Sequence, residues 1–393
     1  MFKGLKENNG DIEDVVKTGG EVDWRRIRED FPVTQTMAYL NSAGAGPVPR
    51  GVASAATHYY QELMERGDAR WFEWMAQRER GRTRLAEMIN AEPDEIAFTT
   101  NTSAGMNLII DALEGSGEVI SCDLEFPVST ITWMHRGIKV HLLKAVDGEV
   151  RVEEVGRAKT DKTGVICLSH VQYSNGFRLN PAEVGEIKGR HAFVLNASQS
   201  AGVLPIDVKR MRVDGLCATG HKWMLGGYGS GFVYLSRELL HRTRPRAISW
   251  LSVEDPFAMK NDEFRLRTEA GARSESGCPP FANIFALGEA GRYHLSIGAE
   301  NVERRALELN RQLTARLIEH GWNILSPLRS EDARSAETLV GVEHPKQTVT
   351  HLASRGVAVT IKPEGFRAAT HFFNNEDDIA RLIAALDETR ASG

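Results

Sequence analysis

A single lysine stands where a predicted buried strand runs into a glycine-rich turn. In the stretch VDGLCATGHKWMLGGYGSGF (residues 213–232), Lys222 follows the apolar run GLCAT and precedes a cluster of glycines over 226–231. A lysine that is partly withdrawn from water has a lowered pKa, and its neutral amine is nucleophilic enough for Schiff-base chemistry. Glycines let a bulky ligand approach the backbone closely. The same spacing also suits a solvated lysine beside a turn, and it matches neither G-x-G-x-x-G nor a P-loop.

Two amide side chains are predicted at the same edge of the sheet as Lys222. Asn196 and Gln199 follow the apolar run AFVL in AFVLNASQSAG. Ligands of parallel α/β sheets bind at the carboxyl ends of the strands. We therefore expect both amides to share a crevice with Lys222. Two further residues, Gln172 and Tyr173, directly follow the predicted strand GVICLSHV and could contact a substrate there.

A third stretch, FTTNTSAGMN, places hydroxyl groups where a strand passes into a helix. Thr102 and Ser103 stand at the start of that predicted helix. Hydroxyls and free backbone N–H groups at a helix N-terminus can bind an anion. Taken alone, the pattern is also that of an ordinary helix cap.

These residues depend on an alternation of short apolar strands and helices. The strands EIAFTT, EVISC, GVICLSHV, AFVLN and GFVYLS are separated for the most part by helical stretches, which favours a mainly parallel α/β sheet with helices on both faces. Before them the apolar spacing predicts a helix over 51–90. After Pro279 it predicts a long helix over 281–321, short strands and a closing amphipathic helix, which indicate a smaller α+β domain.

Composition excludes several classes of protein. The chain has 393 residues, of which 41% are hydrophobic and 26% charged, as in an ordinary globular protein of two domains. Its net charge of -5 argues against nucleic acid or an anionic membrane as a partner. The 4 cysteines include no C-x-x-C pair, so we expect neither a disulfide framework nor a cysteine metal site. The sequence shows neither a signal peptide nor a transmembrane run, and we expect a cytoplasmic protein.

The tetrapeptide TGHK (219–222), followed by GGYGSGFVYL, resembles the class V aminotransferase family of fold type I pyridoxal-phosphate (PLP) enzymes, in particular its cysteine desulfurase, selenocysteine lyase and C–S lyase branch. The resemblance runs from about Tyr39 to the C-terminal helix. It implies PLP as cofactor, a small amino acid as substrate, and a homodimer with a shared active site. The implied α/β fold has a large domain with a mostly parallel seven-stranded sheet over 36–284 and a small C-terminal α+β domain over 285–393, after an N-terminal segment over 1–35.

The resemblance also implies a role for each matching residue. Lys222 would carry PLP as a Schiff base and later move protons on the substrate. Arg367 would bind the substrate carboxylate, for which the fork of a guanidinium is suited. The expected cofactor contacts are Phe126 against the pyridine ring, Gln199 at the phenolic oxygen, Asn196 at the ring nitrogen, Thr102, Ser103, Thr219 and His221 at the phosphate, and Gly277 with Cys278 at the phosphate of the neighbouring subunit.

Three departures from the family pattern bear on the reaction. Asn196 stands where the family has an aspartate that keeps the pyridine nitrogen protonated, so the ring should be a weaker electron sink. The segment 355–367, RGVAVTIKPEGFR, lacks the cysteine on which the desulfurases of the family carry sulfur as a persulfide. Cys278 replaces an expected threonine, which weakens one phosphate contact.

The missing cysteine favours a lyase that eliminates a sulfur-bearing or similar group from a small amino acid. A class V aminotransferase and an amino-acid epimerase remain alternatives, because they use the same groups and differ in where a proton returns. A non-catalytic binding or assembly protein of the same fold is an alternative of another class.

Overall fold

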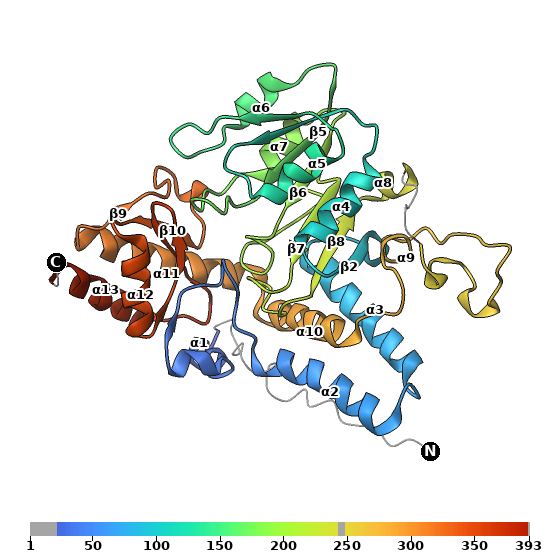
Figure 1. Cartoon of the computed structure of the whole chain (residues 1–393), viewed down its shortest axis with the longest axis horizontal. Coiled ribbons are helices and arrows are strands. Elements are labelled where there is room, and N and C mark those ends of the chain that lie inside the picture. The colour runs from blue at the N-terminus through green and yellow to red at the C-terminus, as the bar shows by residue number, and fades with distance from the viewer. Residues whose placement is uncertain (1–21, 243–247, 392–393) are drawn as a thin grey trace.

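The computed structural model describes residues 22–242 and 248–391 (Figure 1). Of the predicted N-terminal segment 1–35, residues 1–21 lie outside the described residues. The remainder contains helix α1 (Trp24–Glu29), which packs into an aromatic cluster at the C-terminal side of the molecule. Within the described ranges, no helix has both the length and the apolar character needed to cross a membrane.

The centre of the molecule is a seven-stranded sheet. Its strands are β2 (Ile96–Thr99), β3 (Glu118–Cys122), β4 (Val140–Leu143), β5 (Thr163–Ser169), β6 (Ala192–Asn196), β7 (Gly215–Thr219) and β8 (Gly231–Leu235). They lie in the order β2-β8-β7-β6-β5-β3-β4, and every pair is parallel except the two that β8 makes. The central strands are almost entirely buried, as strands covered on both faces must be. The predicted mostly parallel seven-stranded sheet is confirmed.

Helices cover both faces of this sheet (Figure 1). Because successive side chains of a strand point to opposite faces, the neighbours Cys167 and Leu168 of β5 belong to different apolar clusters. On the Leu168 side the cluster includes residues of α3 (Trp71–Met88), α6 (Val152–Ala158), α7 (Pro181–Ile187) and α10 (Phe281–Ile297). On the Cys167 side it includes residues of α4 (Thr102–Ala112), α5 (Ile131–His135), α8 (Arg237–Arg242) and α9 (Ala270–Ser274).

Two helices predicted as continuous are each broken in two, so those predictions were wrong. The helix expected over 51–90 is α2 (Arg50–Arg66) followed by α3, and the helix expected over 281–321 is α10 followed by α11 (Ala299–Glu319). A glycine stands at each break, Gly67 with φ 58° and Gly298 with φ 88°. A glycine adopts these conformations without steric cost and so ends a helix there, while the apolar spacing continues on both sides.

A second, four-stranded antiparallel sheet lies in the C-terminal part. It consists of β9 (Asn323–Ile324), β10 (Glu337–Gly341), β12 (Thr360–Lys362) and β13 (Gly365–Ala369), in the order β12-β13-β10-β9. With α11, α12 (Pro345–Ser354) and α13 (Glu376–Ala391) it forms the orange-to-red region at the left of Figure 1. Leu313, Leu352, Phe366 and Leu382 share its apolar core.

The N-terminal strand joins this C-terminal region. Strand β1 (Ala38–Tyr39) pairs in parallel with β11 (Val357–Ala358), and Asn41 bridges to Ala369 of β13. The boundary predicted at residue 285 falls inside α10, whose Phe285 packs in the core of the large sheet. The division into domains remains a prediction.

Candidate active site

Lys222 lies in the turn that follows β7, and a neighbouring loop packs directly against it. The backbone N–H of Gly46 donates to the carbonyl of His221 at 2.8 Å. A Cβ at Gly46 would lie 2.2 Å from the carbonyl oxygen of Lys222, so only glycine permits this approach. Burial lowers the pKa of Lys222 to about 8, and the positive charge of Arg367 acts in the same direction. The amine of Lys222 is therefore a better nucleophile near neutral pH than that of a solvated lysine.

An aromatic ring stands over this amine. The Nζ atom of Lys222 lies 5.9 Å from the ring centroid of Phe126. The ring of Tyr173 is nearly perpendicular to that of Phe126, with the centroids 5.1 Å apart. Phe126 is nevertheless 47% exposed. A flat aromatic ligand attached to Lys222 could stack on the exposed face of Phe126 and cover it.

The two predicted amides lie at and just beyond the carboxyl end of β6, and both are buried. Asn196 donates from Nδ2 to Oγ of Ser129 at 3.0 Å, and its Oδ1 accepts from the N–H of Ser198 at 3.0 Å. Gln199 donates from Nε2 to the carbonyl of Ala43 at 3.1 Å. A side-chain amide has two N–H groups. Beyond these bonds each amide therefore keeps one N–H for a ligand.

The start of α4 offers backbone donors. Asn101 caps the helix by accepting from the N–H of Ala104 at 2.9 Å. The N–H groups of Thr102 and Ser103 have no acceptor inside the helix, as at every helix start. Oγ1 of Thr102 lies 2.6 Å from Oγ of Ser198, which ties this helix start to the loop after β6. The arrangement fits an anion such as a phosphate.

His221 is held in a fixed orientation beside Lys222. Its Nδ1 lies 2.7 Å from Oγ1 of the buried Thr219. Its ring stacks on that of Tyr228, with the centroids 4.4 Å apart. Burial, together with the charge of Lys222, lowers the pKa of His221 to about 4. The imidazole is therefore neutral near pH 7, and its Nε2 is the nitrogen left to meet a ligand.

Arg367 lies on β13 with one edge of its guanidinium already engaged. Its Nη1 donates to the carbonyl of Tyr173 at 2.9 Å and lies 3.0 Å from Oε2 of Glu337 in a buried ion pair. Its Nε is buried and has no hydrogen-bond partner in the described part of the chain. A buried donor without a partner is costly. The Nε edge is therefore suited to receive the carboxylate of a substrate.

The residues around Lys222 correspond to the parts of the expected cofactor. Lys222, with its lowered pKa, suits the imine of PLP. The half-exposed ring of Phe126 and the free amide N–H groups suit the pyridine ring, and the start of α4 suits the phosphate. The residues fit that group. The individual roles assigned from the sequence remain predictions.

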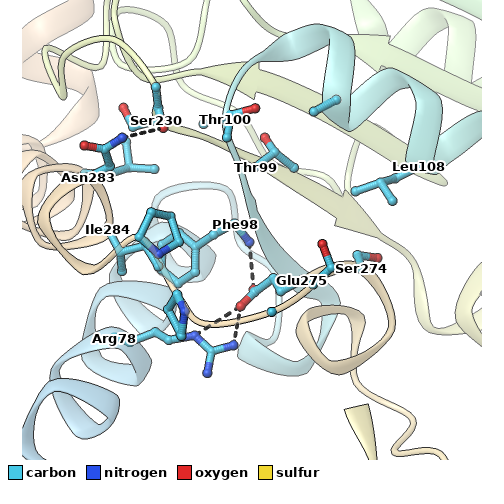
Figure 2. Close-up of a pocket in the computed structure, with 18 of the residues that line it drawn as sticks. Arg78, Phe98, Thr99, Thr100, Leu108, Ser230, Ser274, Glu275, Asn283 and Ile284 are labelled. Carbon is cyan, nitrogen blue, oxygen red and sulfur yellow. Dashed lines mark hydrogen bonds and ion pairs between the residues drawn. The ribbon is translucent and has the colours of Figure 1, made fainter. Parts of the chain in front are cut away.

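Three predicted residues are not brought to Lys222 within one chain. Gly277, which precedes the exposed Cys278, lines a separate cavity of about 280 Å³ that also includes Thr99, Thr100 and Asn283 (Figure 2). Their predicted role at the phosphate of a neighbouring subunit remains a prediction. Gln172 is fully buried, and its Nε2 donates to Glu125 at 2.9 Å. Its role toward the substrate remains a prediction.

Sequence reasoning missed two charged residues of the site, Glu337 and Lys362. Glu337 is the first residue of the otherwise uncharged strand ETLVG, and a glutamate is almost never buried unless it is paired. That unusual position was the available signal. Lys362 lies in the segment 355–367. The prediction for this segment concerned its missing cysteine and assigned no role to Lys362.

The sequence of this chain matches a known protein family and is similar to proteins in other organisms. The family model "Aminotransferase class-V" matches residues 38–382. The uncharacterized aminotransferase YcbU of Bacillus subtilis (strain 168) is 27% identical over 363 residues, which cover 91% of this chain and 96% of that protein.

Solved structures share the fold. The apo cysteine desulfurase from Thermococcus onnurineus NA1 superposes with a TM-score of 0.85 at 24% identity, covering 94% of this chain and 98% of that one. The cystine C–S lyase C-DES, in complex with cysteine persulfide, superposes with a TM-score of 0.82 at 24% identity, covering 91% and 98%. At this level of identity the likeness bears on the fold alone.

Proposed function

Because this chain belongs to the aminotransferase class-V family, we propose that it is a PLP-dependent lyase that eliminates a sulfur-bearing group from the β-carbon of a small amino acid. The protein is a PLP-dependent enzyme, and the proposal concerns its reaction. PLP supplies an imine link to the substrate nitrogen and a ring that withdraws electrons from the α-carbon. The C–S lyase among the structural neighbours acts on cystine, which makes this class of reaction a natural candidate here.

The observation that carries the proposal is the fold of residues 355–367. They form β11, β12, a two-residue turn and the start of β13, and they contain no cysteine. The other cysteines offer no replacement inside the sheet. Burial raises the pKa of Cys122, Cys167 and Cys217, so their thiols stay protonated. Residues 355–367 therefore provide no nucleophilic thiol, and the one exposed cysteine, Cys278, belongs to a different segment, so we expect the sulfur to be released rather than held on the protein.

In this reaction each side chain of the site has a separate role. The Nε edge of Arg367 binds the substrate carboxylate. Lys222, once displaced by the substrate amine, takes the proton from the α-carbon and can return it to the leaving sulfur. Phe126 would hold the PLP ring from one face, and Asn196 would contact the ring nitrogen. Two chains form a homodimer in which Gly277 and Cys278 reach the phosphate bound by the partner.

Product analysis tests this proposal. Elimination from L-cysteine with water gives pyruvate, ammonia and sulfide, whereas desulfuration gives alanine and leaves the sulfur on the protein. The purified holoenzyme is incubated with L-cysteine, L-cystine and cysteine S-conjugates, and all of these products are quantified, with Lys222→Ala as the inactive control. We expect pyruvate in step with the sulfur product. Formation of pyridoxamine phosphate and a keto acid would instead identify an aminotransferase. Formation of the D-amino acid would identify an epimerase. The absence of any product would identify a binding protein.

A further inference from the structure

Three charged side chains share one face of the small sheet. In the antiparallel register, Arg367 of β13 lies opposite both Leu339 of β10 and Thr360 of β12. Side chains two residues apart on a strand point to the same face. Glu337, two residues before Leu339, and Lys362, two residues after Thr360, therefore project to the same side as Arg367.

Lys362 and Arg367 converge on one oxygen atom. The carbonyl of Tyr173 accepts from Nζ of Lys362 at 2.9 Å and from Nη1 of Arg367 at 2.9 Å. The two nitrogen atoms can thus be separated by no more than twice that distance. Lys362 also lies over the ring of Tyr173, with Nζ 4.3 Å from the centroid. Both cations consequently border the place where Phe126 and Tyr173 meet above Lys222.

The charges of these groups do not cancel. The carboxylate of Glu337 forms its ion pair with Arg367, and both side chains are buried. In the described part of the chain, Lys362 contacts only the uncharged carbonyl and ring of Tyr173 at close range. Glu337 also attracts Lys362, but its single charge is shared with Arg367. Glu364 acts on Lys362 from an exposed turn where solvent and salt screen it. With Lys222 committed to the cofactor, two cations face one anion.

We propose that Glu337 is a specificity residue that holds the substrate pocket at one net positive charge, so that the enzyme accepts an amino acid with one uncompensated carboxylate and rejects one with an acidic side chain. The inference rests on the proposed function, since it takes an amino acid as the ligand. Lys362 supplies the positive charge that Glu337 leaves uncompensated. A second carboxylate would enter a pocket whose charge the first has already neutralised, and it would lie near the buried carboxylate of Glu337.

Anion binding to the holoenzyme tests the inference without catalysis. Butyrate and succinate have the same number of carbon atoms and differ in one carboxylate, and neither has an amino group that could displace Lys222. Their dissociation constants are measured by isothermal titration calorimetry for the wild type, Glu337→Gln, Glu337→Asp and Lys362→Met. Lys346→Met, which removes an exposed lysine on α12, is the matched control for overall charge.

The wild type should prefer butyrate. Glu337→Gln should shift the ratio toward succinate at least about tenfold, whereas Glu337→Asp, which keeps the charge, should not. Lys362→Met should weaken butyrate binding about tenfold, whereas Lys346→Met should leave it unchanged. The double variant Glu337→Gln/Lys362→Met should regain most of the wild-type affinity for butyrate, because its pocket has the original net charge.

An unchanged butyrate-to-succinate ratio in Glu337→Gln, or unchanged butyrate affinity in Lys362→Met, would overturn the inference. If Glu337→Gln does not fold, the comparison of Lys362→Met with Lys346→Met still decides whether Lys362 provides the charge. Failure of the lyase proposal would appear separately, as the absence of pyruvate from sulfur amino acids while the anion affinities follow the charges as stated.

Discussion

Asn196 donates a hydrogen bond to Ser129 at the carboxyl end of the central sheet, with Nδ2 and Oγ 3.0 Å apart. The opposite end of the amide is identified by its partner, because the backbone N–H of Ser198, 3.0 Å from Oδ1, can only donate. The nitrogen of Asn196 is therefore the end that keeps a free donor. A neutral donor facing the ring nitrogen of PLP would leave that nitrogen unprotonated, so charge developing at the substrate α-carbon would be only weakly stabilised by the ring.

Asn196→Asp should change the outcome of the reaction. The carboxylate can still accept from Ser198, and the hydroxyl of Ser129 can rotate to donate to it. The carboxylate should keep the ring nitrogen protonated and raise the ratio of transamination to elimination by roughly tenfold, the scale of one hydrogen bond to a charged group. Stopped-flow spectra should gain long-wavelength absorbance, and pyridoxamine phosphate is assayed beside pyruvate. A wild type that already completes many transamination cycles would contradict this prediction.

Lys222→Ala should abolish covalent attachment of the cofactor. The purified wild-type protein should absorb in the visible region, and borohydride should fix PLP to the peptide that contains Lys222. In the variant we expect no fixed PLP and a loss of turnover of at least about 10²-fold, the usual contribution of a general acid–base group. Mass spectrometry of the reduced, digested protein locates the attachment. Fixation at another lysine would disprove the assignment.

Capture of PLP by the apoprotein should accelerate as the pH rises through about 8. Burial lowers the pKa of Lys222 to about 8, and only the neutral amine attacks an aldehyde. Burial lowers the pKa of Lys362 to about 8 as well. Both lysines bind fewer protons in the folded than in the unfolded protein, so the apoprotein should also gain stability between about pH 8 and pH 10.5. Urea titrations of the wild type and Lys222→Met measure that share, and an identical pH dependence would refute it.

Sulfur should not remain on the protein during turnover. Cys278 is the one exposed cysteine among the four, and the other three are buried. With ³⁵S-labelled L-cysteine as substrate, we expect label in free sulfide and none on any cysteine after gel filtration. Cyanide, which releases persulfide sulfur as thiocyanate, provides the second readout. Labelled thiocyanate from Cys278 would show that the chain works as a desulfurase.

Glu275→Gln should destabilise the fold strongly. The carboxylate forms ion pairs with Arg78 and Arg82 and accepts from the N–H of Phe98 at 2.8 Å, beside the cavity of Figure 2. Burial alone would raise the pKa of Glu275, but the two guanidinium groups hold it below its usual value. Glu275→Gln removes the carboxylate charge that pairs with the buried guanidinium groups of Arg78 and Arg82. We expect the free energy of unfolding to fall by about 3 kcal/mol.

The comparison for this variant is Glu238→Gln, which breaks an exposed i,i+4 pair with Arg242 and should cost less than about 0.5 kcal/mol. Urea denaturation of both variants gives the difference in the free energy of unfolding. Because the folded-state pKa of Glu275 is depressed, its contribution is present above the unfolded pKa and lost as the pH falls through the folded value. Equal losses in the two variants would contradict the prediction.

Local patterns in the sequence predicted the alternation of strands and helices, and the resemblance carried by TGHK singled out Lys222, whose role stays a prediction. The apolar strands and the turn around Lys222 were predicted from residues close together in the chain, and the mostly parallel sheet is confirmed. The same spacing rule could not find the ends of helices at Gly67 and Gly298, because apolar periodicity continues across a glycine that takes a positive φ.

Only the tertiary structure decided which charged side chains lie beside Arg367. Glu337, Lys362 and Arg367 belong to three different strands, and their side chains meet because β10, β12 and β13 pair in one register. A shift of one residue would turn each side chain to the other face of the sheet. The loop with Tyr173, nearly 200 residues earlier in the chain, supplies the carbonyl on which both cations converge. The sequence names the residue types at these positions, but burial and pairing, which give Glu337 its charge partner, arise from packing between segments far apart in the chain.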